Sequence, residues 1–235
     1  MDWAAFEAAT RQVSELYARA LSLHEQGVHL LCTDEKTGIQ ALERATPTLS
    51  PIPGFVERQD AHYVRHGTRT LTGNFEVATG RILAPTIAAT RSEKDFVGHV
   101  TRTVALDPEG EWIFVVDNLN THLSESLVRF VAQRCGLQVD LGRKGLCGIL
   151  RSRHTRAAFL SDAAHRLRFV YTPIRASWLN QIELWFSILS RRLLRRGNFL
   201  SVHHLRDRIL AFIEYFNNTL AKPFKWTYRG RPLAA

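Results

Sequence analysis

The chain has 235 residues, 45% of them hydrophobic, and a formal net charge of +9, a composition that allows a sizeable core and excludes a disordered chain. It contains no run of about 18 apolar residues, and its N-terminus lacks the basic start and apolar stretch of a secretory signal, so no membrane partner is expected. The three cysteines form no CxxC pair, which favours a reducing cytoplasm over a disulfide scaffold.

The N-terminal part of the chain is predicted to be a helix that leads into a strand. Apolar residues recur at helical spacing over residues 2–25, and Gly27 ends the helix. Residues 28–33 are typical of a short apolar strand that ends at Asp34, where the sequence becomes charged. Residues 37–45 are expected to form a further strand and turn.

A loop, a hairpin and a helix are predicted to follow. Three prolines and a glycine make residues 46–54 a loop. Small, polar and apolar residues alternate over residues 68–88 around Thr79–Gly80, which predicts a β-hairpin. A helix is expected over residues 92–107, with Ser92 as its N-cap.

An apolar strand over residues 112–116 stops abruptly at Asp117. A polar turn explains an acid at this place, because Asp and Asn favour turns. A catalytic carboxylate explains it equally well, because open α/β sheets bind ligands at the carboxyl ends of their strands. A helix that begins near Ser124 and ends at Gly136 is expected next.

Positive charge is concentrated in the second half of the chain. Residues 1–117 contain 11 Lys and Arg against 16 Asp and Glu, whereas residues 118–235 contain 20 against 6. Segment 138–168 is rich in Arg and Gly and weakly periodic, which predicts an irregular basic insertion with one short helix. Such charge indicates a polyanion partner, most often nucleic acid, and a merely soluble basic surface is the alternative.

The chain is predicted to finish with a strand and two helices. The strand covers residues 169–173 and ends at its proline. The helices cover residues 177–196, with Ser177 as N-cap, and residues 201–220. The tail, residues 222–235, mixes aromatic and basic side chains, which suits either DNA binding or docking on the core.

Glu183 takes an unusual position on the first of these helices. It falls between Leu179 and Phe186, on the shoulder of a continuous apolar stripe. A carboxylate beside apolar neighbours needs a partner, which an arginine or a divalent cation can supply. Asp34, Asp117 and Glu183, on three separate elements, offer the oxygen ligands that two hard cations need for phosphodiester chemistry.

Four stretches of the sequence resemble one known family. The resemblance is to the catalytic domain of bacterial insertion-sequence transposases of the mariner type, members of the DDE superfamily. It extends over nearly the whole chain from about residue 28, and its motifs are specific in combination. The stretches are CTDEKTGIQALER (32–44), YVRHGTRTL (63–71), VVDNLNTH (115–122) and SWLNQIELWFSILSRRLLRRG (177–197).

The resemblance implies an α/β fold of the RNase H-like (retroviral-integrase-like) type, in which helices flank a mixed sheet. The basic segment 138–168 would be an insertion before the last strand. An N-terminal helical segment would cover residues 1–27, the catalytic domain residues 28–221, and a C-terminal tail residues 222–235. The catalytic and metal-binding acids of the family would be Asp34, Asp117 and Glu183.

The resemblance also implies an activity and its partners. A transposase of this kind cleaves DNA strands and transfers the freed 3′-OH into target DNA, with two Mg2+ ions, or Mn2+, as cofactor. The implied partners are double-stranded DNA, as transposon ends and as target, and a second copy of the chain in a homodimer. Such a protein would be cytoplasmic and associated with the bacterial nucleoid.

Two departures from the family pattern keep alternatives open. Asp117 and Glu183 are 66 residues apart, nearly twice the common spacing, and segment 138–168 accounts for the excess. Only 33 residues precede Asp34, too few for the helix-turn-helix module that reads terminal repeats. An inactive DNA-binding fragment that inhibits a full-length transposase is one alternative, and a structure-specific nuclease of the same fold is another.

Further residues are expected to assist the acids. Glu35 is a rival to Asp34 as a ligand, but strand alternation puts the two side chains on opposite faces. A zinc site at His203 and His204 is not expected, because companion ligands are missing. Polar residues expected to support the acids are Asn118, His122 and Asn180. Basic residues expected to contact DNA phosphates are Arg143, Lys144, Arg151, Arg153, Arg191, Arg192, Arg195 and Arg196.

Overall fold

A five-stranded mixed sheet forms the centre of the part of the chain that the computed structural model describes, residues 3–46, 50, 52–56 and 62–228. The strands are β1 (Val28–Arg44), β2 (Tyr63–Glu76), β3 (Ile82–Ala88), β4 (Glu111–Val116) and β5 (Leu167–Tyr171). Their order across the sheet is β3-β2-β1-β4-β5. The pairs β1–β2 and β2–β3 are antiparallel, whereas β1–β4 and β4–β5 are parallel.

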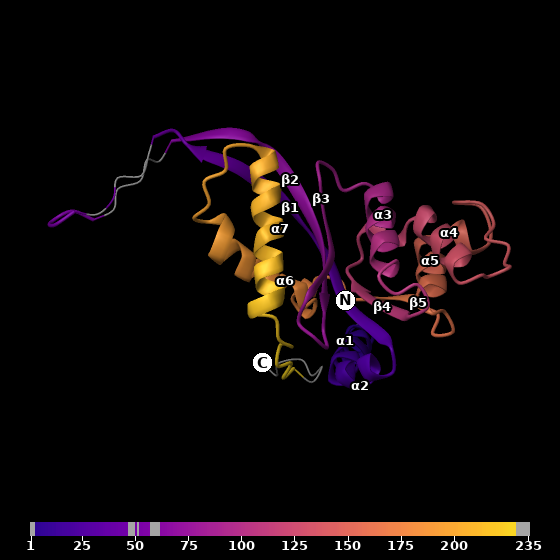
Figure 1. The fold of residues 1–235 in the computed structure, drawn as a ribbon. Coiled ribbons are helices and arrows are strands. Elements are labelled where there is room, and N and C mark those ends of the chain that lie inside the picture. The colour runs from indigo at the N-terminus through magenta and orange to yellow at the C-terminus, as the bar shows by residue number, and fades with distance from the viewer. Residues whose placement is uncertain (1–2, 47–49, 51, 57–61, 229–235) are drawn as a thin grey trace.

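Helices cover both faces of this sheet, which confirms the predicted fold class (Figure 1). They are α1 (Trp3–Ala18), α2 (Ala20–Glu25), α3 (Glu93–Val104), α4 (Glu125–Arg134), α5 (Arg153–Leu160), α6 (Ile182–Leu189) and α7 (Val202–Thr219). In Figure 1, α3, α4 and α5 lie to one side of the sheet, and α6 and α7 lie to the other. Within the described ranges, no helix has the length and apolar character that crossing a membrane requires.

The side chains of β4 point alternately to the two faces of the sheet and pack into a core on each. Ile113 and Val115 belong to the core cluster that α6 and α7 complete. Phe114 and Val116 belong to the cluster that α3, α4 and α5 complete. A strand that is buried on both faces is apolar throughout, which explains why β4 stands out in the sequence.

The first strand is much longer than predicted, and Asp34 does not end it. β1 has 17 residues and runs through the charged stretch that follows Asp34. The strands expected at residues 28–33 and 37–45 are one strand, because a β-bulge around Gly38 (φ 66°) lets the pairing with β2 continue. The prediction was wrong because an antiparallel strand can continue through charged residues where one of its faces is exposed, as β1 does after Asp34.

The helix predicted over residues 177–196 is broken. Ser177 begins a 3-10 turn and does not cap the helix, because Asn180 has an extended conformation (φ −80°, ψ 108°). Helix α6 begins only at Ile182. The chain after α6 continues as a π-helical turn over Ser190–Leu194.

The other predicted elements form as expected. The N-terminal helix is present as α1 and α2, with a break at Arg19. Ser92 caps α3 in a full capping box, Ser124 caps α4, and Gly136 (φ 66°) follows α4. The hairpin of β2 and β3 turns at Gly80 (φ 73°). Parts of the N-terminal segment, the Pro-rich loop and the tail lie outside the described residues, namely 1–2, 47–49, 51 and 229–235.

The basic segment 138–168 contributes to the core as well as to the surface. It contains the short helix α5, as predicted, and Leu150 and Leu160 are fully buried in the cluster with α3 and α4. Arg156 donates hydrogen bonds to the carbonyl oxygens of Leu123 (2.6 Å) and Leu150 (3.0 Å). The segment is therefore fastened to the fold, and its role as a DNA-facing insertion stays a prediction.

Gly80→Ala is expected to destabilise the protein far more than Gly136→Ala. Both glycines have φ in the left-handed region, where an L-residue costs about 1–2 kcal/mol. A Cβ at Gly80 would also collide with the backbone of Lys222, whereas nothing lies within 4 Å of one at Gly136. We expect urea unfolding to show a loss of about 1 kcal/mol for Gly136→Ala and of roughly 3 kcal/mol or more for Gly80→Ala. Equal losses would contradict this packing of the hairpin turn.

Candidate active site

The pairing of β1 with β4 brings two of the predicted acids level with each other. Cys32 pairs with Val115 in this parallel ladder, and the same register sets Asp34 beside Asp117. Neighbouring strands lie about 4.8 Å apart, so residues at the same level are close in space. Asp117 directly follows the carboxyl end of β4.

Helix α6 approaches the sheet at the same level. Asp34 pairs with Gly73 of β2. A Cβ at Gly73 would lie 3.0 Å from Ile182 Cδ1 and 3.9 Å from Phe186 Cε1, so the helix packs closely against the sheet at this glycine. The first turn of α6 carries Glu183, which the close packing therefore brings toward Asp34.

A buried asparagine ties the start of α6 to β1. Asn180 Nδ2 donates a hydrogen bond to the carbonyl oxygen of Thr33 (2.9 Å), the residue before Asp34. The backbone carbonyl of Asn180 accepts a hydrogen bond from the N–H of Glu183 (3.1 Å). Because Asn180 is fully buried, this link fixes the third acid relative to the first. Asn180 is thus bonded to the strand that carries Asp34, and its role in supporting the acids stays a prediction.

Tyr17 of α1 reinforces the same link. Its hydroxyl donates to the carbonyl oxygen of Leu179 (2.8 Å) and lies 3.0 Å from Cys32 Sγ. Burial raises the pKa of the Cys32 thiol to about 12, so the thiol stays neutral and serves packing. The N-terminal helix therefore helps to hold the segment that leads into α6.

Asp34 is buried, with 8% of its surface exposed, and its pKa is shifted strongly. Burial raises the pKa of Asp34 to about 7, against the hydrogen bond that its Oδ1 accepts from the N–H of Glu35 (2.7 Å). The negative charges of Asp117, Glu35 and Glu183 raise this pKa further. Asp117 and Glu183 are therefore both close enough to Asp34 for their charges to affect its pKa.

A buried histidine holds Asp117. His122 Nδ1 lies 2.8 Å from Asp117 Oδ1, and His122 Nε2 lies 3.2 Å from Glu35 Oε1. Burial opposes the charge of His122, but the two carboxylates outweigh it and raise the pKa of His122 to about 9. Burial also opposes the charge of Asp117, but His122 outweighs it and lowers the pKa of Asp117. Glu35, the rival to Asp34, is thus engaged by His122.

Glu183 differs from its expected environment. The sequence pattern predicted that its side chain lies beside apolar neighbours. The residue is exposed, because Ile182 and Trp185 take the buried positions of α6. No ion pair involves Asp34 or Glu183 within the described ranges, so neither of these acids has an arginine partner there. The ligand atoms of the three acids do not all lie within 4.8 Å of one another in that part of the chain.

Asn118 fixes the turn that follows β4. Its Nδ2 donates to the carbonyl oxygen of Thr172 (2.6 Å), the residue that follows β5. Arg153 of α5 donates to the carbonyl oxygen of Asn118 (2.6 Å). Arg153, which was expected to contact DNA, therefore has a structural contact next to Asp117.

Two basic residues beside the acids escaped the sequence analysis. Lys36 shares the face of β1 that carries Asp34, and its Nζ lies 5.9 Å from the ring centroid of Phe186. Arg91 lies close enough to Asp117 to add to the effect of His122 on its pKa, against the effect of burial. Strand alternation could have indicated Lys36, whereas no sequence pattern places Arg91 beside a residue so distant along the chain.

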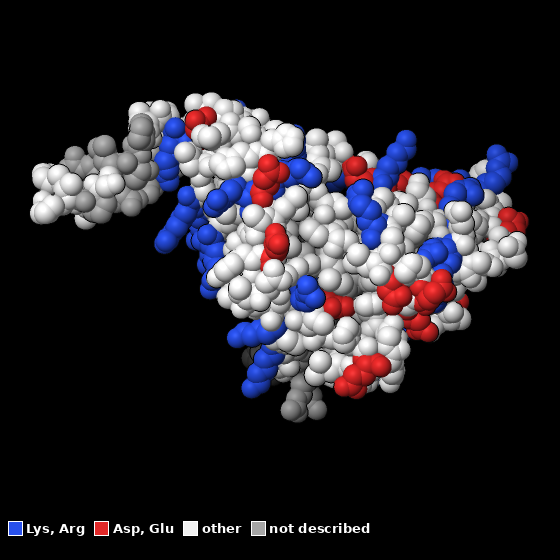
Figure 2. Space-filling view, viewed as in Figure 1, with Lys and Arg blue, Asp and Glu red and all other residues white. Residues whose placement is uncertain are grey.

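A basic groove of about 630 Å3 lies between the turn after α6 and helix α7. Figure 2 shows Lys and Arg side chains along the left edge of the molecule, where Figure 1 places the chain that follows α6. Arg195 is exposed nearby. Arg143, Lys144 and Arg151 are also exposed, but they belong to the basic segment, which packs with α3 and α4 on the other side of the sheet. Sequence analysis missed Arg208 and Tyr215. The charged and aromatic residues that line the groove are Arg191, Arg192, Arg196, Arg208, Phe212 and Tyr215.

Asp34→Asn is expected to stabilise the metal-free protein at alkaline pH. The folded-state pKa of Asp34, about 7, lies above the ordinary value of 3.8, so its contribution to stability is present below pH 3.8 and is lost as pH rises through 7. An amide removes this loss, which is at most about 4 kcal/mol. Urea unfolding in EDTA measures the free energy of unfolding of both proteins. The gain of the variant over wild type should be larger at pH 8 than at pH 5. The exposed control Glu109→Gln should change little, and an Asp34→Asn protein no more stable than wild type at pH 8 would contradict the assignment.

His122→Ala is expected to destabilise the protein by about 3–5 kcal/mol, because it leaves the Glu35 carboxylate buried without a cation. Glu35→Gln should recover part of this loss, so that the double variant is more stable than the single variant. The raised pKa of His122 means that its contribution is present below about pH 6.5 and is lost as pH rises through about 9. Additive effects in a double-mutant cycle would show that the two side chains do not interact.

Comparison with solved structures agrees with this fold. The chain matches the Mos1 mariner paired end complex with Mn at a TM-score of 0.50 and 11% identity, over 88% of this chain and 55% of that one. It matches a pre-cleavage Mos1 transpososome at 0.50 and 10%, over 88% and 56%. The likeness shows the RNase H-like fold alone, and the chain spans a little over half the length of these Mos1 chains. No curated protein sequence matches the chain.

Comparison of the sequence with models of protein families identifies the family of the chain. Residues 29–206, more than half of the chain, match the family described as DDE superfamily endonuclease. The match includes the parallel strands and all three predicted acids, and it agrees with the resemblance to DDE enzymes. The chain therefore belongs to the DDE superfamily endonuclease family.

Proposed function

We propose that this chain is the catalytic domain of a transposase, which cleaves DNA strands and transfers the freed 3′-OH into target DNA. The observation that carries the proposal is the strand register that sets Asp34 beside Asp117, with the charge of Glu183 also acting on Asp34, in a chain of the DDE superfamily endonuclease family. Mg2+ is the proposed cofactor, as two ions, with Mn2+ as a substitute. The presence of Mn in a Mos1 complex of the same fold is in keeping with this choice.

The donor set fits hard divalent cations. Asp34 and Glu183 provide carboxylate oxygens that no ion pair occupies within the described ranges, and burial together with neighbouring acids makes the charge of Asp34 unfavourable. A cation would bind the unoccupied carboxylate oxygens and would compensate the unfavourable charge of Asp34. Bound ions of this kind supply charge stabilisation to the attacking and leaving oxygens of a phosphodiester. Asp34, Asp117 and Glu183 are the residues proposed to hold them.

The remaining residues of the site orient the acids and the DNA. The imidazolium of His122 holds the carboxylate of Asp117 in place, and Asn180 sets the position of Glu183. Lys36 and Arg91 flank the acids and are suited to contact the phosphates on either side of the scissile bond. The basic groove offers a separate surface for the DNA backbone, because guanidinium groups bind phosphate oxygens bidentately.

The proposal extends to the partners and to the organisation of the chain. A paired-end complex is known for Mos1, and we propose that this chain likewise acts as a homodimer on transposon ends and target DNA. We further propose a bacterial insertion-sequence protein that is cytoplasmic and associated with the nucleoid. Residues 1–27 would be its N-terminal helical segment, 28–221 its catalytic domain and 222–235 its tail.

A structure-specific nuclease is the second candidate. The family description names an endonuclease, and hydrolysis of DNA needs the same acids and cations without a target strand. Joined products distinguish the two functions, since only a transposase links the freed 3′-OH to a second DNA molecule. The inactive inhibitor considered in the sequence analysis would give neither product.

The triad test uses supercoiled plasmid DNA with Mg2+ or Mn2+. Asp117→Asn and Glu183→Gln should each lower the rate of metal-dependent nicking by about 100-fold or more, because each removes a carboxylate from the place where charge develops. Gel-shift affinity for DNA should stay within about twofold, since the phosphate contacts remain.

Glu214→Gln is the matched control, because Glu214 is an exposed acid on α7. It should nick at the wild-type rate. Nicking by Asp117→Asn and Glu183→Gln at the wild-type rate would remove these acids from the mechanism.

A further inference from the structure

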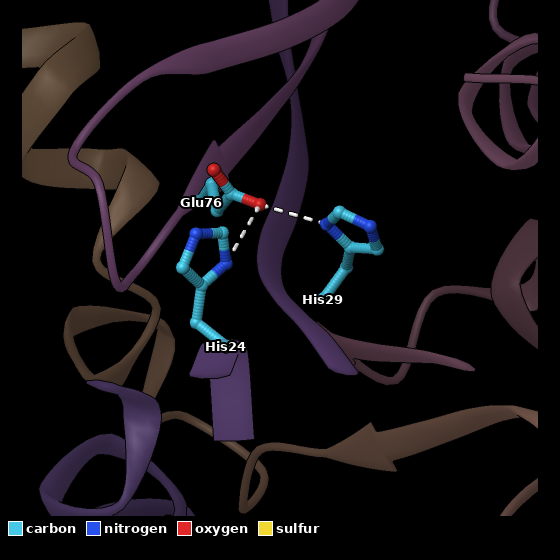
Figure 3. Close-up of side chains that lie close together, drawn as sticks. All are labelled: His24, His29 and Glu76. Carbon is cyan, nitrogen blue, oxygen red and sulfur yellow. Dashed lines mark hydrogen bonds and ion pairs between the residues drawn. The ribbon is translucent and has the colours of Figure 1, made fainter. Parts of the chain in front are cut away.

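A second cluster of ligating side chains lies toward the other end of β1. It consists of His24 at the C-terminal end of α2, His29 near the start of β1 and Glu76 at the end of β2. Their ligand atoms all lie within 4.8 Å of one another, and no other such group of three is found within the described ranges. Figure 3 shows both imidazole rings directed at the same carboxylate oxygen.

We propose that His24, His29 and Glu76 bind a divalent transition-metal ion of the Zn2+ type, at a site separate from the acids of the candidate active site. Two imidazoles and one carboxylate are a donor set that Zn2+ uses in proteins, with water in the fourth position. Mg2+ prefers oxygen ligands alone, so this set selects a different ion from the one proposed for Asp34, Asp117 and Glu183.

The distances fit such an ion with small adjustments. Ligand atoms about 2.0–2.1 Å from a tetrahedral ion lie about 3.3–3.4 Å from each other. Glu76 Oε1 lies 2.9 Å from His29 Nδ1 and 3.9 Å from His24 Nδ1, on either side of that value. An ion would take the place of the proton that now joins His29 to Glu76, and binding would release that proton to solvent.

The groups behind the ligands are those that accompany metal sites. The other ring nitrogen of His29, Nε2, lies 3.3 Å from Asp107 Oδ2, so a carboxylate is in place to fix the tautomer. The other oxygen of Glu76, Oε2, accepts a hydrogen bond from the Thr79 hydroxyl (2.6 Å). The His29 ring also stacks on Trp112, with 4.0 Å between ring centroids. Both inner ligands are therefore held in orientation before any ion arrives.

Burial explains why the cluster needs a cation and how an ion reaches it. The side chain of Glu76 is 5% exposed, and a buried carboxylate is costly without a positive partner. His24 is 42% exposed on the outer side, which leaves a path for an ion and for its bound water. An ion here would fasten α2 to β1 and β2, and so would stabilise the part of the fold that precedes Asp34.

The test titrates Zn2+ into the full chain carrying Asp34→Asn and Asp117→Asn, which removes the competing carboxylates. Calorimetry should give one equivalent of tightly bound Zn2+, and the melting temperature should rise with its concentration. Bound Co2+ should give the visible absorption of a tetrahedral site. Either no saturable Zn2+ binding or no Co2+ spectrum of this type would overturn the proposal.

Three further variants show whether the binding belongs to this cluster. His24→Gln should weaken Zn2+ binding by about 100-fold without unfolding the protein, since His24 is a surface residue. Asp107→Asn should weaken it by about 10–100-fold. His203→Gln, a change at an exposed histidine on α7, should leave it unchanged. Equal Zn2+ affinity in His24→Gln and its parent would mean that the cluster is only a network of protonated histidines and carboxylates.

Discussion

The parallel pairing of β1 with β4 is the constraint on which the rest of the site depends. Its register sets Asp34 beside Asp117, although the two are 83 residues apart along the chain. A shift by one residue would turn Asp34 to the opposite face of the sheet. The apolar side chains of β4 hold this strand in the middle of the fold, because they pack into the cores on both faces of the sheet.

The third acid is positioned by close packing. Gly73 lets α6 lie against the sheet, and Asn180 fastens the start of that helix to β1. Tyr17 adds a link from the N-terminal helix to the same segment. This support is buried and largely uncharged, whereas the acids that it positions repel one another. Burial and the neighbouring acids make the negative charge of Asp34 unfavourable, a condition that the proposed cation would relieve.

Sequence patterns predicted the features that depend on neighbours along the chain. The apolar run before Asp117 predicted β4, the Ser92 cap predicted the start of α3, and a start near Ser124 was predicted for α4. Features that depend on tertiary contacts were missed. The bulge at Gly38 joins two predicted strands, and the bond from Asn180 to β1 prevents Ser177 from starting a helix. The contact of His122 with Glu35, and the meeting of two histidines with Glu76, join residues that no local pattern relates.

The central claim is that one pocket gathers Asp34, Asp117 and Glu183 around divalent cations. Anomalous X-ray scattering from crystals of the full chain with Mn2+ tests it most directly, since it locates the ions without reference to activity. The account predicts Mn2+ in contact with the carboxylates of Asp34 and Asp117, with Glu183 completing the site. Crystals that bind Mn2+ only elsewhere, with Asp34 free of metal, would contradict it.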